Sequence, residues 1–221
     1  RVEFLIHGGD LFDVPRPDMR SLELLRWLLK ELGLPVYCIA GNHDLVEQSP
    51  DSIEDTALGY LSRHRCVRLL QPGEKIYLAN SSCVLQLSGQ HYHPTIDRSR
   101  DRSGYMVKKR KCDLAVHVVH GMLVPRAFSS RVSSTLINDI AGTEADFTLG
   151  GHAHLGYHVI SNGKYFLNPG ALARLTNLER ELVRVPQVVF LDFSSSASYS
   201  FVPLLNARPG EEVMDLKKPE K

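Results

Sequence analysis

The 221-residue sequence has no long apolar segment and no excess of charge of either sign. No apolar run approaches the roughly 18 residues that a membrane-spanning helix needs, so such a segment is excluded. The 26 Lys and Arg residues nearly balance the 25 Asp and Glu residues, and the formal net charge of +1 excludes a highly basic, histone-like binder, although a local basic groove stays compatible with it. Internal repeats and low-complexity tracts are also missing. Because 43% of the residues are apolar, the chain can build one substantial core and is not disordered as a whole.

Cysteine is scarce in the sequence. The four residues are Cys38, Cys66, Cys83 and Cys112, and no two of them form a Cys-x-x-Cys pair. Three lie in or beside apolar stretches typical of strands, so we expect reduced core thiols in a cytoplasmic protein. A structural zinc site made of cysteines is not expected.

The two ends of the sequence indicate part of a longer protein. The chain starts at Arg1 without an initiator Met or a signal peptide and runs at once into an apolar stretch. We therefore expect that it begins inside a domain and that the natural protein has residues before Arg1. One domain is predicted over residues 1–205. The polar residues 206–221 are predicted to be a linker or the truncated start of a C-terminal region.

One local pattern occurs four times: a short apolar run, then a polar turn rich in Gly and in side chains that bind metals. The apolar runs are residues 2–6, 36–40, 114–119 and 147–149. The turns are Gly-Gly-Asp at 8–10, Gly-Asn-His-Asp at 41–44, His-Gly at 120–121 and Gly-Gly-His-Ala-His at 150–154. Continuous apolar runs of this length are typical of strands buried on both faces, as in a parallel sheet.

A helix is predicted between the first two runs. Five of the six leucines between residues 22 and 32 recur with helical spacing, Asp18 is a suitable N-cap, and Gly33 supplies the stop. Such a strand–helix–strand unit makes the two strands parallel, with carboxyl ends pointing the same way.

The rest of the chain contains three predicted hairpins and two further predicted helices. The hairpins pair residues 75–78 with 83–87, 157–160 with 164–167, and 188–193 with 199–202. The helices lie near residues 52–64 and 130–141. Together these elements predict an α/β sandwich in which two sheets pack face to face with helices outside.

Six side chains that suit a metal site follow the apolar runs. Ligands of an open parallel sheet bind outside the carboxyl ends of its strands, so we expect the four turns to bring these side chains together. They are Asp10, Asn42, His43, His120, His152 and His154. A carboxylate, an amide oxygen and imidazoles favour Mn, Fe or Zn over Ca. The set fits a binuclear centre with ions about 3.5–4 Å apart, which activates water and stabilises an in-line phosphoryl transition state.

The order of these motifs resembles that of calcineurin-like metallophosphoesterases. The motifs are Gly-Asp-Leu-Phe-Asp at 9–13, Gly-Asn-His-Asp at 41–44, His-Gly at 120–121 and Gly-His-Ala-His at 151–154. A lone His-Gly carries almost no information, but four motifs in order, each closing an apolar run, are specific. The resemblance covers residues 1 to about 205. It implies a four-layer αββα sandwich with two mixed sheets and flanking helices.

The resemblance also implies which side chains hold metal. Two divalent ions are expected, with Mn²⁺ as the first expectation and Fe, Zn or Mg as alternatives. Asp10 is expected to bridge the ions, and Asn42, His120 and His152 to bind one of them. His154 is expected to bind the other.

Two further roles follow from the same resemblance. His43 is expected to touch the phosphate and to protonate the leaving oxygen, and Asp44 to orient His43. The first motif of the family, an Asp-x-His after its first strand, is absent from the sequence. We therefore expect the domain to lack its first strand and first metal motif, which would lie upstream of residue 1.

Softer features resemble the nuclease subunits of SbcCD-type DNA repair exonucleases from bacteria and phages. They are Gly-Gly-Asp-Leu-Phe-Asp at 8–13, Val-His-Gly-Met-Leu at 119–123, and Asn-Pro-Gly-Ala at 168–171 with Arg174 soon after. The resemblance implies a cytoplasmic, metal-dependent phosphodiester hydrolase that cuts DNA as an exonuclease, or also as an endonuclease, in repair, recombination or replication. It further implies an SbcC-like ATPase partner and raises a homodimer as an additional expectation.

Two basic stretches precede the third turn. Charge runs are usually solvated surface, but these lie on a long insert that also holds Tyr92 and Tyr105. A basic groove of this kind would contact a phosphate backbone without reading its sequence. The residues predicted to contact DNA are Arg98, Arg100, Arg102, Lys108 and Lys109.

Other polar residues near the motifs have simpler expected roles. His117 lies three residues before the third turn, so a strand turns it to the opposite face, and we expect an interior or interface residue. His7 is expected to be packed. His91 and His93 have a His-x-His spacing but lie in a loop without the strand–turn pattern, which favours a surface or substrate-edge position. Asp13 stays open between a place beside the metal ligands and a polar approach to the helix.

Two other functions remain open from the sequence. A phosphatase or a cyclic- or small-nucleotide phosphodiesterase would have the same metal site, and the strength and salt dependence of DNA binding would separate it from a nuclease. A non-catalytic scaffold is supported by the missing first motif alone. The joint presence of all six metal-type side chains argues against it.

Overall fold

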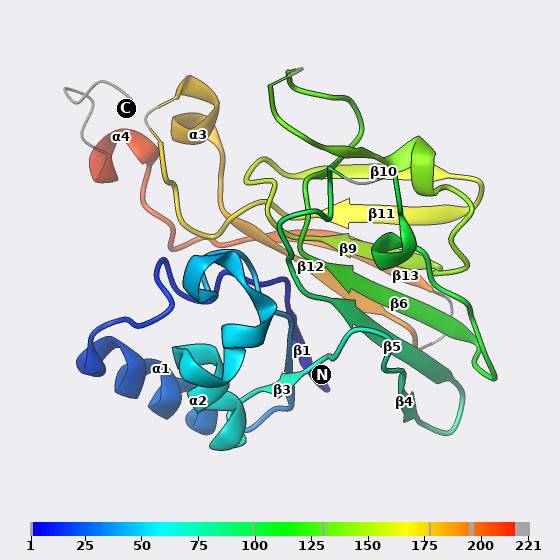
Figure 1. The fold of residues 1–221 in the computed structure, drawn as a ribbon, viewed down its shortest axis with the longest axis horizontal. Helices are drawn as coiled ribbons and strands as arrows, with labels where there is room; N and C mark the ends of the chain where they lie inside the picture. Colours follow the sequence, from blue (N-terminus) through cyan, green and yellow to red (C-terminus); the bar gives the residue numbers. More distant parts are fainter. Residues whose placement is uncertain (1, 99, 130, 177, 195–196, 215–221) are drawn as a thin grey trace.

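The computed structural model shows two sheets packed on each other, with helices α1 (Met19–Leu32) and α2 (Ala57–Arg63) outside the smaller one (Figure 1). The structure describes residues 2–98, 100–129, 131–176, 178–194 and 197–214. This arrangement confirms the predicted α/β sandwich.

The smaller sheet is parallel and ends in the first two motif turns. Its order is β1 (Leu5–His7), β2 (Val36–Cys38), β3 (Arg68–Leu69), so β1 lies at an edge. Helix α1 connects β1 to β2 as predicted. The side chain of Asp18 accepts a hydrogen bond from the main-chain nitrogen of Ser21, and the helix ends at Gly33 in the left-handed conformation.

The larger sheet is mixed and ends in the other two motif turns. Its order is β10-β11-β9-β6-β5-β4, with bounds β4 (Ile76–Ala79), β5 (Val84–Gln90), β6 (Leu114–Val119), β9 (Phe147–Gly150), β10 (Tyr157–Ser161) and β11 (Lys164–Asn168). The four inner strands are parallel, and the edge strands β4 and β10 are antiparallel to their neighbours. The predicted hairpins β4–β5 and β10–β11 are confirmed. Asn162 and Gly163, both with positive φ, form the turn of the second.

Apolar side chains between the two sheets form the central core. Tyr37 and Ile39 of the smaller sheet pack with Val116, Val118 and Phe147 of the larger one. The third predicted hairpin, β12 (Gln187–Asp192) with β13 (Ser198–Pro203), adds partly buried side chains to the same core. The carboxyl ends of β1, β2, β6 and β9 are held against each other by this packing.

The outer face of the larger sheet is covered by loops and short elements. The helix predicted over residues 130–141 is wrong: the described part forms β8 (Thr135–Leu136), paired with β7 (Leu123–Val124), and a 3₁₀ helix (Ile137–Ile140). Residue 130 lies outside the described residues. Thr135 donates from its nitrogen to Met122 and from its hydroxyl to Asp97. These non-local bonds outweigh the weak helix propensity of a segment rich in Ser, Thr and Val.

Short helices complete the fold. Three 3₁₀ helices span Val46–Gln48, Pro50–Asp55 and Ser103–Tyr105, and two short α-helices, α3 and α4, span Glu179–Val183 and Gly210–Val213. The helix predicted near residues 52–64 is divided by Thr56, whose hydroxyl caps α2. Residues 215–221 of the predicted linker lie outside the described residues.

Arginines tie the C-terminal segment to the domain. Arg174 donates to the main-chain oxygens of Glu181, Arg184 and Arg208. Arg184 and Glu181 form an ion pair of 3.0 Å in which both side chains are largely buried. Residues 206–214 therefore contact the domain at Arg208.

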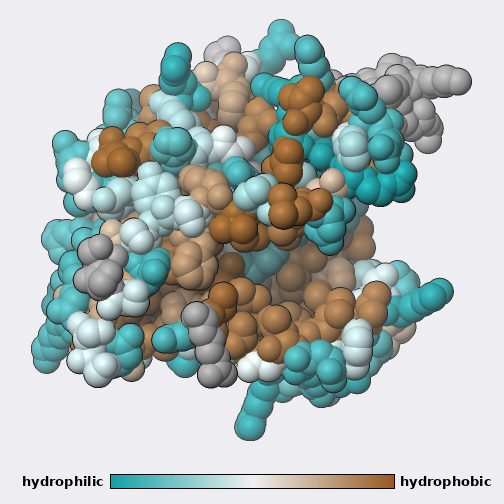
Figure 2. Space-filling model, turned by 180° about the vertical axis from the view of Figure 1, so that it is seen from behind, coloured by the Kyte–Doolittle hydropathy of each residue, from teal (hydrophilic) through white to brown (hydrophobic). Residues whose placement is uncertain are grey.

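Apolar surface is unevenly distributed. Seen from behind, a hollow lined by apolar side chains crosses the middle of the molecule (Figure 2). On α1, Leu24, Trp27 and Leu28 are exposed. Apolar surface gathered in one place is typical of a contact surface. None of the helices in the described residues has both the length and the apolar character that crossing a bilayer requires. All four cysteines are free, and Cys38 and Cys66 are buried.

Candidate metal centre

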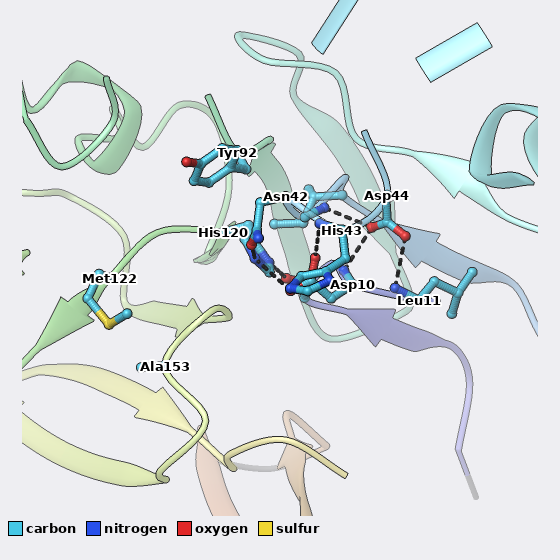
Figure 3. Close-up of polar contacts among 12 residues, drawn as sticks. Asp10, Leu11, Asn42, His43, Asp44, Tyr92, His120, Met122 and Ala153 are labelled. Atoms are coloured by element: carbon cyan, nitrogen blue, oxygen red, sulfur yellow. Dashed lines mark hydrogen bonds and ion pairs between the residues drawn. The ribbon is translucent and has the colours of Figure 1, made fainter. Parts of the chain in front are cut away.

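The four motif turns meet where the carboxyl ends of the two sheets face each other (Figure 3). Asp10 follows β1, His120 follows β6, and His152 follows β9, and ligand atoms of these three side chains all lie within 4.8 Å of one another. Asn42, after β2, places its side-chain oxygen 3.2 Å from Nε2 of His120. The structure thus brings together four of the six side chains that the motifs supply.

His120 is held in one orientation from the opposite sheet. Its Nδ1 lies 2.7 Å from the main-chain oxygen of Gly8, which can only accept, so Nδ1 donates. Nε2 is left to face the cluster, 3.2 Å from Oδ2 of Asp10. The side chain is 1% exposed. An imidazole with one nitrogen held in this way presents the other as a metal ligand.

Asp10 is ionised in its surroundings. Burial by itself raises the pKa of its carboxyl, but the hydrogen bond and charge of His120 and the main-chain nitrogen of His43 outweigh burial and hold the pKa below its ordinary value. Oδ1 accepts from the nitrogen of His43 at 2.9 Å. A carboxylate with one oxygen toward each of two turns suits a bridging ligand.

His152 is neutral near pH 7. Burial, followed by the charge of His120, lowers its pKa from 6.5 to about 4. A neutral imidazole keeps a lone pair for a metal ion. Its ring lies 5.1 Å from the ring of His120, centroid to centroid.

The backbone of the cluster is strained. Asp10 and His152 have φ values of 56° and 68°, in the left-handed region that residues other than glycine avoid. Such positions cost about 1–3 kcal/mol each and gather at functional sites. A Cβ at Gly41 would overlap the carboxylate of Asp10, so only glycine fits there. The donor set and its forced geometry fit a divalent transition-metal ion.

Asp44 differs from its predicted role. Its carboxylate accepts from the main-chain nitrogens of Asp10 at 2.7 Å, Leu11 at 3.0 Å and Gly41 at 2.8 Å. Burial raises the pKa of Asp44, and the bonds from the backbone act against that rise. The prediction that Asp44 orients His43 is wrong, because Asp44 holds these three amides while Nδ1 of His43 is bonded to Asp13. Asp44 instead fastens the first two motif turns to each other.

His43 is oriented by Asp13. Nδ1 of His43 lies 2.9 Å from the main-chain oxygen of Asp13 and 3.3 Å from its carboxylate. The side chain of His43 is 40% exposed, at the mouth of the cluster. The open question about Asp13 is thereby answered in favour of a place beside the site.

His154 lies outside the tight cluster. Burial lowers its pKa, while Glu181 and Asp10 act to raise it. Its main-chain oxygen accepts from Ala171 at 3.0 Å, which joins the fourth turn to the segment after β11. Its role as a ligand of a second ion stays a prediction.

The loop after β5 supplies residues that the sequence reasoning misplaced. His91 is 2% exposed, so the surface position predicted for it is wrong. Tyr92 lies beside the cluster, its ring centroid 6.2 Å from that of His120 and 5.7 Å from that of His152 (Figure 3). The sequence carries a signal for this position, because β5 is a fifth apolar run whose carboxyl end meets the same edge, although the run also fits half of a hairpin.

Two of the predicted DNA contacts lie at the wrong end of the sheet. Lys108 pairs with Glu144 at 2.8 Å, and Lys109 pairs with Asp146 at 2.8 Å. Asp146 also accepts from the nitrogen of Ala115, at the amino ends of β6 and β9. The six-residue β6 separates this edge from the cluster by roughly 20 Å. Lys108 and Lys109 therefore hold the starts of the strands.

The other basic residues lie on the loop that contains Tyr92. Arg98 and Arg100 are exposed, and Arg102 is half-buried. Burial raises the pKa of Tyr92, and the nearby charge of Arg98 acts in the opposite direction. Arg98 therefore lies near the hydroxyl end of Tyr92. His117 and His7 are packed, as predicted: His117 contacts Ser88 and Gly104, and His7 is half-buried beside Cys38.

The family follows from this geometry together with the sequence match. A sequence model of the calcineurin-like phosphoesterases matches residues 1–184. The chain belongs to the calcineurin-like phosphoesterase family. This membership confirms the resemblance seen in the motifs and the predicted fold class.

The matches of this calcineurin-like phosphoesterase to individual proteins either cover a short segment or have low sequence identity. A segment of 50 residues is 44% identical to the DNA double-strand break repair protein Mre11 of Methanococcus maripaludis, and it spans 20% of this chain and 13% of that protein. Among solved structures, phosphopantetheinyl hydrolase of Mycobacterium tuberculosis gives a TM-score of 0.51 at 13% identity, over 76% of this chain and 78% of that chain. The sulfate thiohydrolase SoxB of Thermus thermophilus gives 0.53 at 13% identity, over 95% of this chain and 41% of that chain. These two structures share the fold.

Proposed function

We propose that this phosphoesterase is a metal-dependent phosphodiester hydrolase that acts on DNA. The observation that carries the proposal is the convergence of Asp10, His120 and His152 within 4.8 Å, with His43 at the mouth of the cluster. The family supplies the class of reaction, hydrolysis of a phosphate ester.

The donor set determines what the site would bind. Asp10, Asn42, His120 and His152 would hold one divalent ion, and His154 would serve a second, with Mn²⁺ as the expected metal. Such ions, when bound, activate water and stabilise the charge of the in-line transition state. The chain contributes ligands that are already oriented, because both His120 and Asp10 are fixed by main-chain contacts.

His43 would donate the proton that the leaving oxygen needs. Nδ1 donates to the main-chain oxygen of Asp13, so Nε2 is the nitrogen that gains and loses a proton. The Asp13 carboxylate, 3.3 Å from the same Nδ1, also helps to hold the ring in this orientation. A protonated Nε2 at the mouth of the cluster can hydrogen-bond the phosphate and then protonate the departing 3′-oxygen.

DNA is favoured as substrate by two observations. The 44% identical segment belongs to a DNA double-strand break repair protein. Tyr92 also lies beside the cluster, with Arg98 near Tyr92, and an aromatic ring and a cation suit a nucleic-acid base and backbone. An SbcC-like ATPase partner, a homodimer, an endonuclease activity and a cytoplasmic location stay predictions of the resemblance.

The test is cleavage of labelled linear DNA in Mn²⁺, with a nucleotide monoester as the second substrate. We expect DNA cleavage that EDTA abolishes and that His43→Ala reduces about 10²–10⁴-fold. His158→Ala, an exposed histidine on β10, is the matched control. Turnover of the monoester with inert DNA would replace the proposal by a phosphatase, and silence on both would favour the scaffold.

A further inference from the structure

Tyr92 forms one wall of the candidate metal centre. Its ring lies against the rings of His120 and His152, while its hydroxyl donates to the side chain of Gln48 at 3.0 Å on the exposed side. The residue as a whole is half-buried. One edge of the ring thus borders the metal cluster and the other borders open surface.

The backbone next to this ring is fastened to the smaller sheet. The nitrogen of Tyr92 donates to the oxygen of Ala40 at 2.9 Å, and the nitrogen of Ala40 donates to Nδ1 of His91 at 3.0 Å. His91 is therefore a positioning residue whose buried imidazole joins β5 to the end of β2. Ala40 directly precedes the Gly41–Asp44 turn, so the backbone segment that holds Tyr92 also carries the metal-type side chain of Asn42.

The rest of the loop is fastened to the larger sheet. The carboxylate of Asp97 accepts from the hydroxyl of Tyr105 at 2.6 Å, the nitrogen of Met122 at 2.7 Å and the hydroxyl of Thr135 at 2.7 Å. Met122 follows His120 by two residues. Asp97 thus ties the Tyr92 loop to the turn that carries His120, and the ring cannot move far from the cluster.

The surroundings of the ring match a nucleotide. Arg98 is exposed and close to Tyr92, and Gln48, which accepts from the Tyr92 hydroxyl, is exposed. A cation beside an aromatic ring, next to a phosphate-type metal site, is the arrangement that binds one nucleotide by its phosphate and its base.

We propose that Tyr92 is a stacking platform for the nucleobase beside the scissile phosphate, held in place by His91 and Asp97. The proposal rests on the proposed function, because it names the part of DNA that this site recognises. Stacking on a tyrosine is tolerant of sequence, so the platform gives preference for a base over no base and not for one base over another.

The test compares a single-stranded oligonucleotide with an abasic strand of the same length, sugar and phosphate charge. Binding is measured by fluorescence anisotropy in EDTA, and cleavage is measured separately in Mn²⁺. We expect wild type to bind the base-containing strand about tenfold more tightly. Tyr92→Ala should lower that ratio toward one, and Tyr92→Phe should restore it because the ring remains. Tyr77→Ala, an exposed tyrosine on β4, should keep the wild-type ratio.

The outcomes separate this inference from the proposed function. If wild type cleaves both strands and Tyr92→Ala weakens binding to both equally, Tyr92 only supports the fold and the inference is overturned while the nuclease stands. If wild type neither binds nor cleaves either strand but hydrolyses a monoester, the proposed function fails and the stacking platform fails with it. A ratio that falls in Tyr92→Ala and returns in Tyr92→Phe supports both.

Discussion

Asp44 accepts a hydrogen bond of 2.7 Å from the main-chain nitrogen of Asp10, which joins the turns after two different strands. We expect Asp44→Asn to lower the free energy of unfolding by about 1–3 kcal/mol, because an amide cannot accept from three donors as a carboxylate does. Mn²⁺ affinity should fall about tenfold, since Asp10 loses its support. Urea unfolding and titration calorimetry measure the two effects. Asp55→Asn, at an exposed position, is the control, and a variant like wild type in both measurements would refute the support role.

Replacing His152 is expected to raise the stability of the metal-free protein and to weaken metal binding. Its φ of 68° is strained for histidine, whereas asparagine tolerates the left-handed region. His152→Asn should therefore stabilise the metal-free protein by up to about 1 kcal/mol. It should also weaken Mn²⁺ binding by at least about tenfold.

Thermal unfolding with and without Mn²⁺ measures both parts of this prediction. His158→Asn, on the exposed face of β10, should change neither. A His152→Asn protein that keeps full Mn²⁺ affinity would remove His152 from the ligand set.

The role of His43 can be separated from a structural role by the leaving group. If His43 protonates the leaving oxygen, His43→Ala should lose about 10²–10⁴-fold in kcat on DNA. It should lose far less on a 4-nitrophenyl phosphodiester, whose leaving group departs without a proton. Asp13→Ala should show a smaller loss of the same kind, because the main-chain oxygen of Asp13 still holds Nδ1. Equal losses on both substrates would rule out proton donation.

Two buried histidines should make stability depend on pH. Burial lowers the pKa of His91 and of His117 from 6.5 to about 4. Between pH 6.5 and 4 the unfolded chain holds more protons than the folded one, so stability is lost as the pH falls through this window. Each histidine contributes at most about 3 kcal/mol. Urea midpoints from pH 7.5 to 4.5 give the slope, and His117→Gln should flatten it. Parallel slopes for the variant and wild type would contradict the assignment to His117.

The effect of a basic residue on DNA binding should depend on where it lies in the fold, which Arg98, Lys108 and Lys109 can test. Arg98 lies near Tyr92 on the loop that borders the cluster, so Arg98→Ala should weaken DNA binding and reduce the slope of log affinity against log salt by about one phosphate contact. Lys108→Ala and Lys109→Ala should leave DNA binding unchanged, because both lysines pair with acidic residues at the far edge. Anisotropy at several salt concentrations is the measurement. An equal loss for Arg98 and Lys108 would restore the original prediction of one continuous basic groove.

Local patterns predicted the elements that hold the site. Helix α1 with its Asp18 cap and Gly33 stop, and the strands that precede the four motif turns, follow from apolar periodicity and from turn residues that act on their own neighbours. The parallel pairing of β1 with β2 followed from the helix between them. The segment 130–141 could not be predicted in this way, because Thr135 donates hydrogen bonds to Asp97 and Met122, which lie in other segments of the chain.

The sequence by itself determined which metal-type side chains stand at the strand ends: Asp10, Asn42, His43, His120, His152 and His154 follow apolar runs, and the alternation of strand and turn is local. Only the tertiary structure decided their partners. The packing of the two sheets gives His120 its hydrogen bond to Gly8, Asp44 its bond from Asp10, and His43 its bond to Asp13. It also places the ring of Tyr92 beside His120 and His152. These contacts join segments up to 112 residues apart, and no local preference of the chain specifies which distant atoms will meet once the strands pack.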